Sequence, residues 1–125
     1  MIVGIGNDLV DMRRLRQVYS RQPRLPQRLL TKEEQQEFAA RRDAISYLGG
    51  RFAAKEALAK ALRSGVRTPL SWQAIWILGD ESGAPVIYYS PPLQNYLQQR
   101  GITVCHLSIT HHGDYAAAVA IAESR

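Results

Sequence analysis

One stretch of the chain, from about Ser46 to Ser64-Gly65, is apolar or small around most of its circumference when it is drawn as an α-helix. Its apolar arc consists of Leu48, Phe52, Leu58, Ala59 and Leu62. A separate face, which small side chains open to close approach by another element, carries Ala53, Ala54, Ala57 and Ala61. We therefore expect this helix to be buried on much of its circumference, and Gly65 suits the C′ position that ends it.

The chain before this helix predicts a strand followed by two shorter helices. Residues 2–10 alternate as a strand does, and Asp11 is a suitable N-cap for a helix that runs to about Arg21. Two prolines, Pro23 and Pro26, end that helix. A capping box, Thr31-Lys32-Glu33-Glu34, predicts the next helix, from about Lys32 to Arg42.

The chain after the central helix predicts two hairpins separated by a helix. Strands are expected at 72–78 and 86–89, and again at 102–110 and 115–122. The helix between the hairpins starts at Ser90-Pro91 and stops at Gly101. This order of elements is neither a β-α alternation nor all helical. It predicts an α+β fold, with a small antiparallel sheet packed against helices, in a single domain over residues 1–125.

The overall charge restricts the partners that the protein can have. The 125 residues carry a formal net charge of +5, which favours nucleic acid, a membrane surface, a phosphorylated ligand or an acidic protein. A single cysteine, Cys105, is typical of a reducing cytosol. The N-terminus has no signal-peptide pattern, and no apolar run approaches the roughly 20 residues of a membrane helix. These features predict a cytoplasmic protein without a membrane partner.

Two carboxylates lie in settings that suit a metal ion with a phosphate. Asp8 follows Gly4 and Gly6 on the N-terminal strand, where the glycines leave room for a ligand or another backbone. Glu56 lies in the middle of the central helix, at the edge of its apolar arc and four residues before Lys60. Mg²⁺ takes one or two carboxylates and leaves positions for water and phosphate oxygens. The pair therefore predicts a Mg²⁺ site for phosphoryl-type transfer.

A simpler interpretation of Glu56 competes with this one. An exposed Glu–Lys pair four residues apart on a helix is common and contributes only about 0.2–0.5 kcal/mol. Here the neighbouring helix faces are apolar and small, so Glu56 is expected to be partly desolvated. Arg51 and Lys55 add two further cations within the same turns, more than one salt bridge requires. Both features favour a functional site.

Three motifs together resemble a known family. They are Gly4-Ile5-Gly6-Asn7-Asp8-Leu9-Val10-Asp11, Arg51-Phe52-Ala53-Ala54-Lys55-Glu56-Ala57 with Lys60-Ala61, and Ser108-Ile109-Thr110-His111 with Tyr115-Ala116. In this order they resemble the holo-[acyl-carrier-protein] synthases, the short bacterial type of 4′-phosphopantetheinyl transferase. The resemblance implies Mg²⁺-dependent transfer of phosphopantetheine from coenzyme A to a serine of an acidic acyl carrier protein. It also implies a homotrimer whose active sites lie at subunit interfaces.

The resemblance further implies roles for particular residues. Asp8 and Glu56 match the Mg²⁺ ligands, and Lys60 matches the residue that approaches a pyrophosphate oxygen. Arg51 and His111 match positions that hold the adenosine end of coenzyme A, with its 3′-phosphate. Further coenzyme A contacts are predicted at Ser64, Gly65 and Thr110. A base must take the serine proton, and Glu56 is the candidate, acting directly or through a water. One departure from the family is Arg63, where a glycine is common.

A cluster of arginines precedes the central helix. Its members are Arg13, Arg14, Arg16, Arg21, Arg24 and Arg28. Such a run is usually a solvated basic face, and it could also bind nucleic acid, but no nucleic-acid recognition motif accompanies it. A non-catalytic basic module, binding nucleic acid or an acidic protein, is the alternative to an enzyme. In the resembled family, Arg14, Arg21 and Arg24 match arginines that face the carrier protein, and charge alone adds Arg13 and Arg16.

The remaining histidines and the cysteine are expected to be structural. Cys105 and His106 point to opposite sides of their strand, and His112 lies at a turn.

Overall fold

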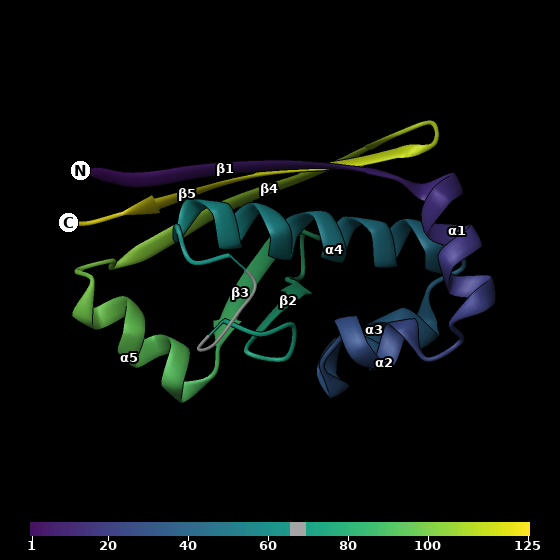
Figure 1. The fold of residues 1–125 in the computed structure, drawn as a ribbon, viewed down its shortest axis with the longest axis horizontal. Coiled ribbons are helices and arrows are strands. Elements are labelled where there is room, and N and C mark those ends of the chain that lie inside the picture. Colours follow the sequence, from purple (N-terminus) through teal and green to yellow (C-terminus); the bar gives the residue numbers. More distant parts are fainter. Residues whose placement is uncertain (66–69) are drawn as a thin grey trace.

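The central helix α4 (Ala44–Ala61) lies between a three-stranded sheet and a second layer of smaller elements (Figure 1). The computed structural model of the chain describes residues 1–65 and 70–125. The sheet is antiparallel, in the order β1-β5-β4, and consists of β1 (Ile2–Asp11), β5 (Tyr115–Glu123) and β4 (Val104–His112). The predicted α+β architecture is confirmed.

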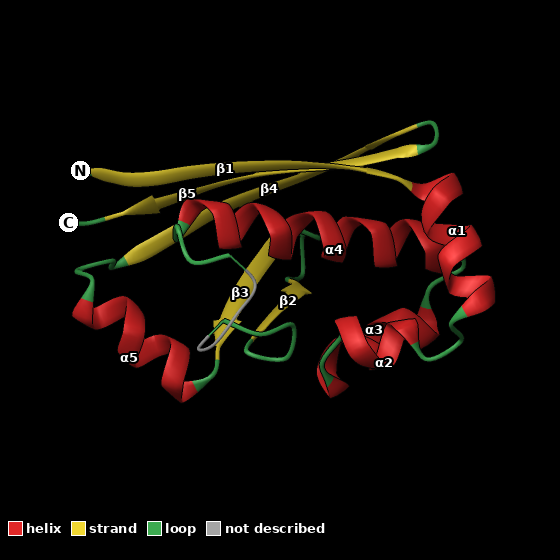
Figure 2. Ribbon diagram, in the orientation of Figure 1, coloured by secondary structure: helices red, strands yellow, loops and turns green. Residues whose placement is uncertain are grey.

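The second layer is built from the remaining helices and a hairpin. In Figure 2, helices α1, α2 and α3 gather at the N-terminal end of α4, whereas the β2–β3 hairpin and α5 lie farther along it. The bounds are α1 (Met12–Arg21), α2 (Leu25–Leu29), α3 (Lys32–Ala40), β2 (Ile75–Gly79), β3 (Pro85–Tyr89) and α5 (Pro91–Gln99). The N-caps predicted at Asp11 and Ser90, and the capping box of Thr31 with Glu34, are all formed.

The small face of α4 contacts strand β1 at very short range. A Cβ atom added to Gly4 would lie 2.0 Å from the carbonyl oxygen of Ala61, and one added to Gly6 would lie 2.0 Å from that of Ala57. Strand β5 presents buried alanines to the same helix, among them Ala118. The expectation that small residues allow close approach is therefore confirmed. Because of this approach, the carboxylate of Asp8 lies beside α4.

The C-terminal end of α4 differs from the prediction. The helix ends at Ala61 with Leu62 as its C-cap, so Gly65 is not the C′ residue. That position belongs to Arg63, whose φ of 60° is in the left-handed region. The N–H groups of Arg63 and Ser64 donate to the carbonyls of Lys60 (3.0 Å) and Ala59 (3.2 Å), which completes a Schellman motif. An arginine there costs about 1 kcal/mol relative to glycine.

Two other local predictions were incomplete. Helix α2 was not expected, because its Pro26 was taken only as a helix stop; the proline lies in the first turn, where no N–H is needed. Strand β2 begins at Ile75 and not at Trp72. The Trp72 carbonyl accepts a hydrogen bond from Lys55, and the Gln73 amide donates to three carbonyls, at residues 27, 28 and 30. These contacts hold Trp72 at α4 and Gln73 at α2 and its C-cap, outside the hairpin.

The outer face of the sheet, which points away from α4, carries exposed apolar side chains among polar ones such as Asn7 and Ser108, which both pair with Val119. Ile5 and Leu9 on β1 are 67% and 66% exposed, and Val119 on the central strand is 39% exposed. Thr110 lies on the same face, because it pairs with Ala117, which in turn pairs with Leu9. Within the described ranges, none of the helices has both the length and the apolar character needed to cross a membrane.

Candidate active site

Three of the predicted site residues meet where β1 passes over the C-terminal half of α4. The Lys60 ammonium donates to the Asn7 carbonyl (2.8 Å) and to the Asp8 carboxylate (3.3 Å). Asp8 and Glu56 line one cavity of about 490 Å³, whose walls also include Arg14 of α1. The structure therefore brings the two candidate metal ligands and the candidate pyrophosphate contact together from two elements 48 residues apart in sequence.

The two carboxylates of this cavity repel each other. The pKa of Glu56 is raised above its usual range, first because the carboxyl group is partly buried and second because the Asp8 charge is near; Lys60 opposes the shift. Lys60 forms its ion pair with Asp8, and within the described part of the chain no ion pair reaches Glu56. The competing interpretation, a simple Glu56–Lys60 pair on a solvated face, is therefore not what the structure shows. The partial burial of its carboxyl group nevertheless favours a cation beside Glu56.

The donor set of this cavity fits a hard divalent cation. Among the described residues no group of three or more His, Cys, Asp or Glu side chains could enclose a metal. Two carboxylates with open positions are what Mg²⁺ commonly uses when water and substrate phosphates complete its shell. A bound cation would also offset the partial burial and the nearby Asp8 charge, the two causes that raise the pKa of Glu56.

The expectation that Arg51 and Lys55 surround Glu56 is wrong. The Lys55 side chain is only 1% exposed and pairs with Glu34 at 2.6 Å, away from the cavity. The Arg51 guanidinium donates to the Ile77 carbonyl and pairs with Glu37. Successive helical positions point in different directions, so closeness in sequence did not mean closeness in space. Of the three cations, only Lys60 contributes to the electrostatics of Glu56.

Arg51 and His111 meet in a second cavity, of about 280 Å³, on another side of α4. The His111 ring nitrogen Nε2 lies 2.9 Å from the Ser46 carbonyl oxygen. Gly50 makes room for this ring, since a Cβ atom there would lie 2.9 Å from Nε2. Arg41 also lines the cavity, a residue that sequence reasoning missed although the basic pair before the helix was a usable signal. The cavity is therefore a candidate anion site.

The other predicted coenzyme A contacts do not join either cavity. Ser64 is buried, and its hydroxyl donates to the carbonyl of Gly65 beyond the end of α4. Thr110 is exposed on the outer face of the sheet, while its neighbour His111 points toward α4. Within one chain, neither Ser64 nor Thr110 lines the cavity that Asp8 lines.

The arginines of the basic cluster have different environments. Arg14 lines the cavity of Asp8 and Glu56, and Arg21 and Arg24 are exposed. Arg13, by contrast, is held by Asp11 at 3.1 Å and lies over the ring of Tyr115. Its charge is thus partly engaged within the chain, which makes it a weaker docking candidate than charge alone suggested.

Cys105 and His106 lie where the sequence placed them. Burial raises the pKa of the Cys105 thiol, so the sulfur is a poor nucleophile, and His106 contacts Glu123 at 2.9 Å on the opposite side of the strand.

The fold and the paired cavities define the class of protein. Residues 4–120 match the model of the 4′-phosphopantetheinyl transferase superfamily, and the chain belongs to this family. A holo-[acyl-carrier-protein] synthase of Exiguobacterium sibiricum is 43% identical over 127 residues, covering 100% of this chain and 91% of that protein.

Solved structures agree with this assignment. The crystal structure of the holo-[acyl-carrier-protein] synthase from Neisseria meningitidis superposes with a TM-score of 0.96 at 38% identity, over 99% of this chain and 100% of that one. The Helicobacter pylori synthase, solved in complex with coenzyme A, has a TM-score of 0.84 at 31% identity, over 95% of this chain and 99% of that one. The family resemblance of the three motifs is thereby confirmed.

Proposed function

We propose that this chain transfers the 4′-phosphopantetheine group of coenzyme A to a serine hydroxyl of an apo acyl carrier protein, releasing adenosine 3′,5′-bisphosphate. The observation that carries the proposal is the cavity lined by Asp8 and Glu56, with Lys60 paired to Asp8, in a chain that belongs to a phosphopantetheinyl transferase family. Relatives named holo-[acyl-carrier-protein] synthase, and one such enzyme solved with coenzyme A, support the choice of both substrates. A cytoplasmic location, and the absence of nucleic-acid and membrane partners, stay predictions from the sequence.

The residues of the two cavities divide the work of this reaction. The serine oxygen attacks the β-phosphate of coenzyme A, and the bond to the adenosine-side phosphate breaks. Asp8 and Glu56 would hold Mg²⁺, which supplies charge neutralisation on the pyrophosphate when bound. Lys60 offsets charge on the leaving phosphate, and Arg51 with His111 binds the adenosine end. Glu56, directly or through a water, is the candidate for accepting the serine proton; a bound Mg²⁺ would lower the pKa of Glu56, which favours the route through a water.

Intact-mass spectrometry tests the reaction and its metal requirement together. An apo acyl carrier protein incubated with this chain, coenzyme A and Mg²⁺ should gain the mass of one phosphopantetheine group. EDTA in excess should abolish the gain, and added Mg²⁺ should restore it. A full gain in EDTA would refute the metal assignment, while no gain with several carrier proteins would refute the transferase and favour the non-catalytic basic module.

We also propose that the active protein is a homotrimer, the copy number that the family resemblance implies. The exposed apolar side chains on the outer face of the sheet, Ile5, Leu9 and Val119, support self-association. Thr110 lies on that face, so a ligand that contacts both Thr110 and the Asp8 cavity must lie between two copies. Sedimentation equilibrium should return the mass of three 14.0 kDa chains.

A substitution at the centre of that face tests the interface. We expect Val119→Glu to shift the protein toward the monomer, because it buries three charges in one interface. Tyr88→Glu is the matched control, since Tyr88 is similarly exposed, at 43%, but lies on the hairpin. A Val119→Glu protein that stays trimeric would place the interface elsewhere.

Carrier-protein docking is proposed for Arg14, Arg21 and Arg24, which are exposed beside the active cavity or at the end of the same helical region. Arg14→Glu should raise the apparent KM for the carrier protein about fivefold or more at low salt, and less at high salt where surface charges are screened. Arg100→Glu, at the C-cap of helix α5, is the control and should leave KM unchanged; α5 lies at the other end of the molecule from α1 (Figure 1). Equal effects of the two substitutions would argue against a local docking surface.

A further inference from the structure

The side of α4 opposite the sheet contains a charged group that the reaction does not use. Lys55 immediately precedes Glu56, yet its ammonium lies in the protein interior. It donates three hydrogen bonds, to Glu34 (2.6 Å) and to the carbonyls of Leu29 and Trp72 (2.8 Å each). An ammonium has three donors, so each of its hydrogens has a partner. Lys55 therefore joins α4 to α2, to α3 and to the segment before β2.

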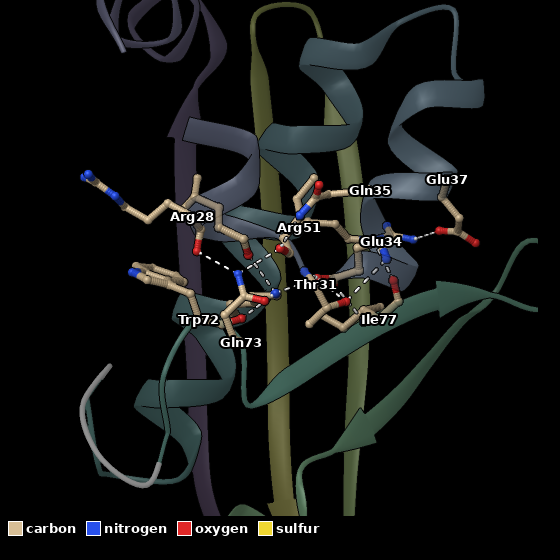
Figure 3. Close-up of polar contacts among 12 residues, drawn as sticks. Arg28, Thr31, Glu34, Gln35, Glu37, Arg51, Trp72, Gln73 and Ile77 are labelled. Carbon is tan, nitrogen blue, oxygen red and sulfur yellow. Dashed lines mark hydrogen bonds and ion pairs between the residues drawn. The ribbon is translucent and has the colours of Figure 1, made fainter. Parts of the chain in front are cut away.

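Glu34 completes this connection from its own side. Its carboxylate is fully buried and accepts from the N–H of Thr31 and, at 2.9 Å, from the N–H of Ile77 on β2 (Figure 3). One turn along α3, Glu37 repeats the arrangement: it pairs with Arg51 of α4 and accepts from the N–H of Gly79. Two glutamates of α3 thus each hold one cation of α4 and one N–H of β2. The Lys55–Glu34 pair is the fully buried member of this ladder.

We propose that the buried Lys55–Glu34 pair is a positioning device for the active site, which sets the rotation of α4 and thereby directs Glu56 toward Asp8; the proposal rests on the metal site proposed above. Lys55 and Glu56 are consecutive, so any rotation of the helix that moves one moves the other by the same angle. A side-chain group about 6 Å from the axis moves about 2 Å for a rotation of about 20°. Displacements of this size are large enough to disrupt a ligand set.

The glycine contacts on the other side of α4 cannot do this alone. Gly4 and Gly6 set how closely β1 approaches the helix, but they contact backbone carbonyls and carry no side chain that would lock its rotation. The directed contacts of Lys55 provide that constraint, because each hydrogen bond requires a particular orientation.

Stability alone does not explain the choice of a charged pair here. Replacing a buried ion pair with apolar groups of similar volume is often neutral or stabilising. Most of the other buried side chains of α4 are alanine or leucine, as at Ala53, Ala54, Ala57 and Leu58, so Lys55 is a charged exception on an otherwise apolar helix. Glu34 also accepts hydrogen bonds from the backbone N–H groups of Thr31 and Ile77, and the amide oxygen of a glutamine could accept some of them.

The test separates rotation from stability. In Lys55→Met/Glu34→Gln the pair loses both charges at similar volume, but the carbonyls of Leu29 and Trp72 also lose their donor, so we expect a lower thermal midpoint in a folded protein. Mn²⁺ binding in the presence of coenzyme A, measured by electron paramagnetic resonance, should also weaken by about tenfold or more, as for residues that orient metal ligands. The Mg²⁺ concentration for half-maximal transfer should rise in parallel, with KM for the carrier protein unchanged.

A matched control is Leu93→Ala, which removes a fully buried side chain on α5. It should lower the thermal midpoint clearly and leave the Mn²⁺ affinity as it is. Wild-type Mn²⁺ affinity in the folded double variant would overturn the positioning role. If circular dichroism shows the double variant unfolded, Glu34→Gln alone takes its place, with an expected weakening of about threefold; unchanged affinity there overturns the role equally. A wild type that binds no Mn²⁺ would overturn the metal site itself, and the positioning role with it.

Discussion

Glu56→Gln is expected to lower the transfer rate by at least about 10²-fold while it makes the metal-free protein more stable. Activity falls because the substitution removes one of the two carboxylates that would hold Mg²⁺. Stability rises because Glu56 is partly buried, lies near the Asp8 charge and forms no ion pair within the described part of the chain. In EDTA at pH 8, the thermal midpoint should rise by about 2 °C or more.

The pH dependence of this gain follows from the direction of the pKa shift. The folded-state pKa of Glu56 lies above the unfolded value, so the folded protein binds this proton more tightly. The stability that this bound proton contributes is fully present below the pKa of the unfolded state, and it is lost as the pH rises through the pKa of the folded state. The gain in stability from Glu56→Gln should therefore be largest above the folded-state pKa of Glu56 and should vanish in acid.

A matched substitution tests whether the effect belongs to the cavity. Glu81→Gln, in the exposed turn of the hairpin, removes the same charge and should change neither stability nor rate appreciably. Asp8→Asn should lower the rate as Glu56→Gln does. If Glu56→Gln instead lowered the midpoint in EDTA, the carboxylate would have an intrachain partner, and the argument for an absent cation would fail.

Gly6→Ala is expected to have the largest effect on stability. The new Cβ would lie 2.0 Å from the carbonyl oxygen of Ala57 and 2.8 Å from the backbone nitrogen of Ala61, and neither backbone atom can move without displacing α4. We expect a loss of about 3 kcal/mol or more, seen as a thermal midpoint lower by about 10 °C. Any folded protein should also be less active, since β1 can relieve the clash only by carrying Asp8 away from Glu56.

Gly79→Ala provides the comparison for this substitution. Its Cβ would find the nearest atoms at 3.8 Å, and its φ is not in the left-handed region, so the midpoint should change little. A Gly6→Ala protein within about 2 °C of the wild type would mean that β1 and α4 do not pack as closely as described.

Local structure followed from sequence where the interactions are themselves local. The caps at Asp11, Thr31 and Ser90 involve residues at most three positions apart, so the residue types alone predicted them. The small face of α4 predicted close packing because the sizes of its side chains, and their helical spacing, can be read directly from the sequence. Helix α2 was missed because a proline can either end one helix or begin the next, and Pro26 was interpreted only as an end.

What the sequence by itself determined about this protein is its family, its α+β layout and the pairing of Asp8 with Glu56 as candidate ligands. Three short motifs carry that information, and each is read without knowing the fold. Only the tertiary structure decided which cation forms an ion pair with which carboxylate: Lys60 pairs with Asp8, whereas Lys55, next to Glu56 in sequence, pairs with Glu34. The physical reason is that an ion pair depends on the direction of each side chain and on segments far apart in the chain, which spacing along one helix does not encode.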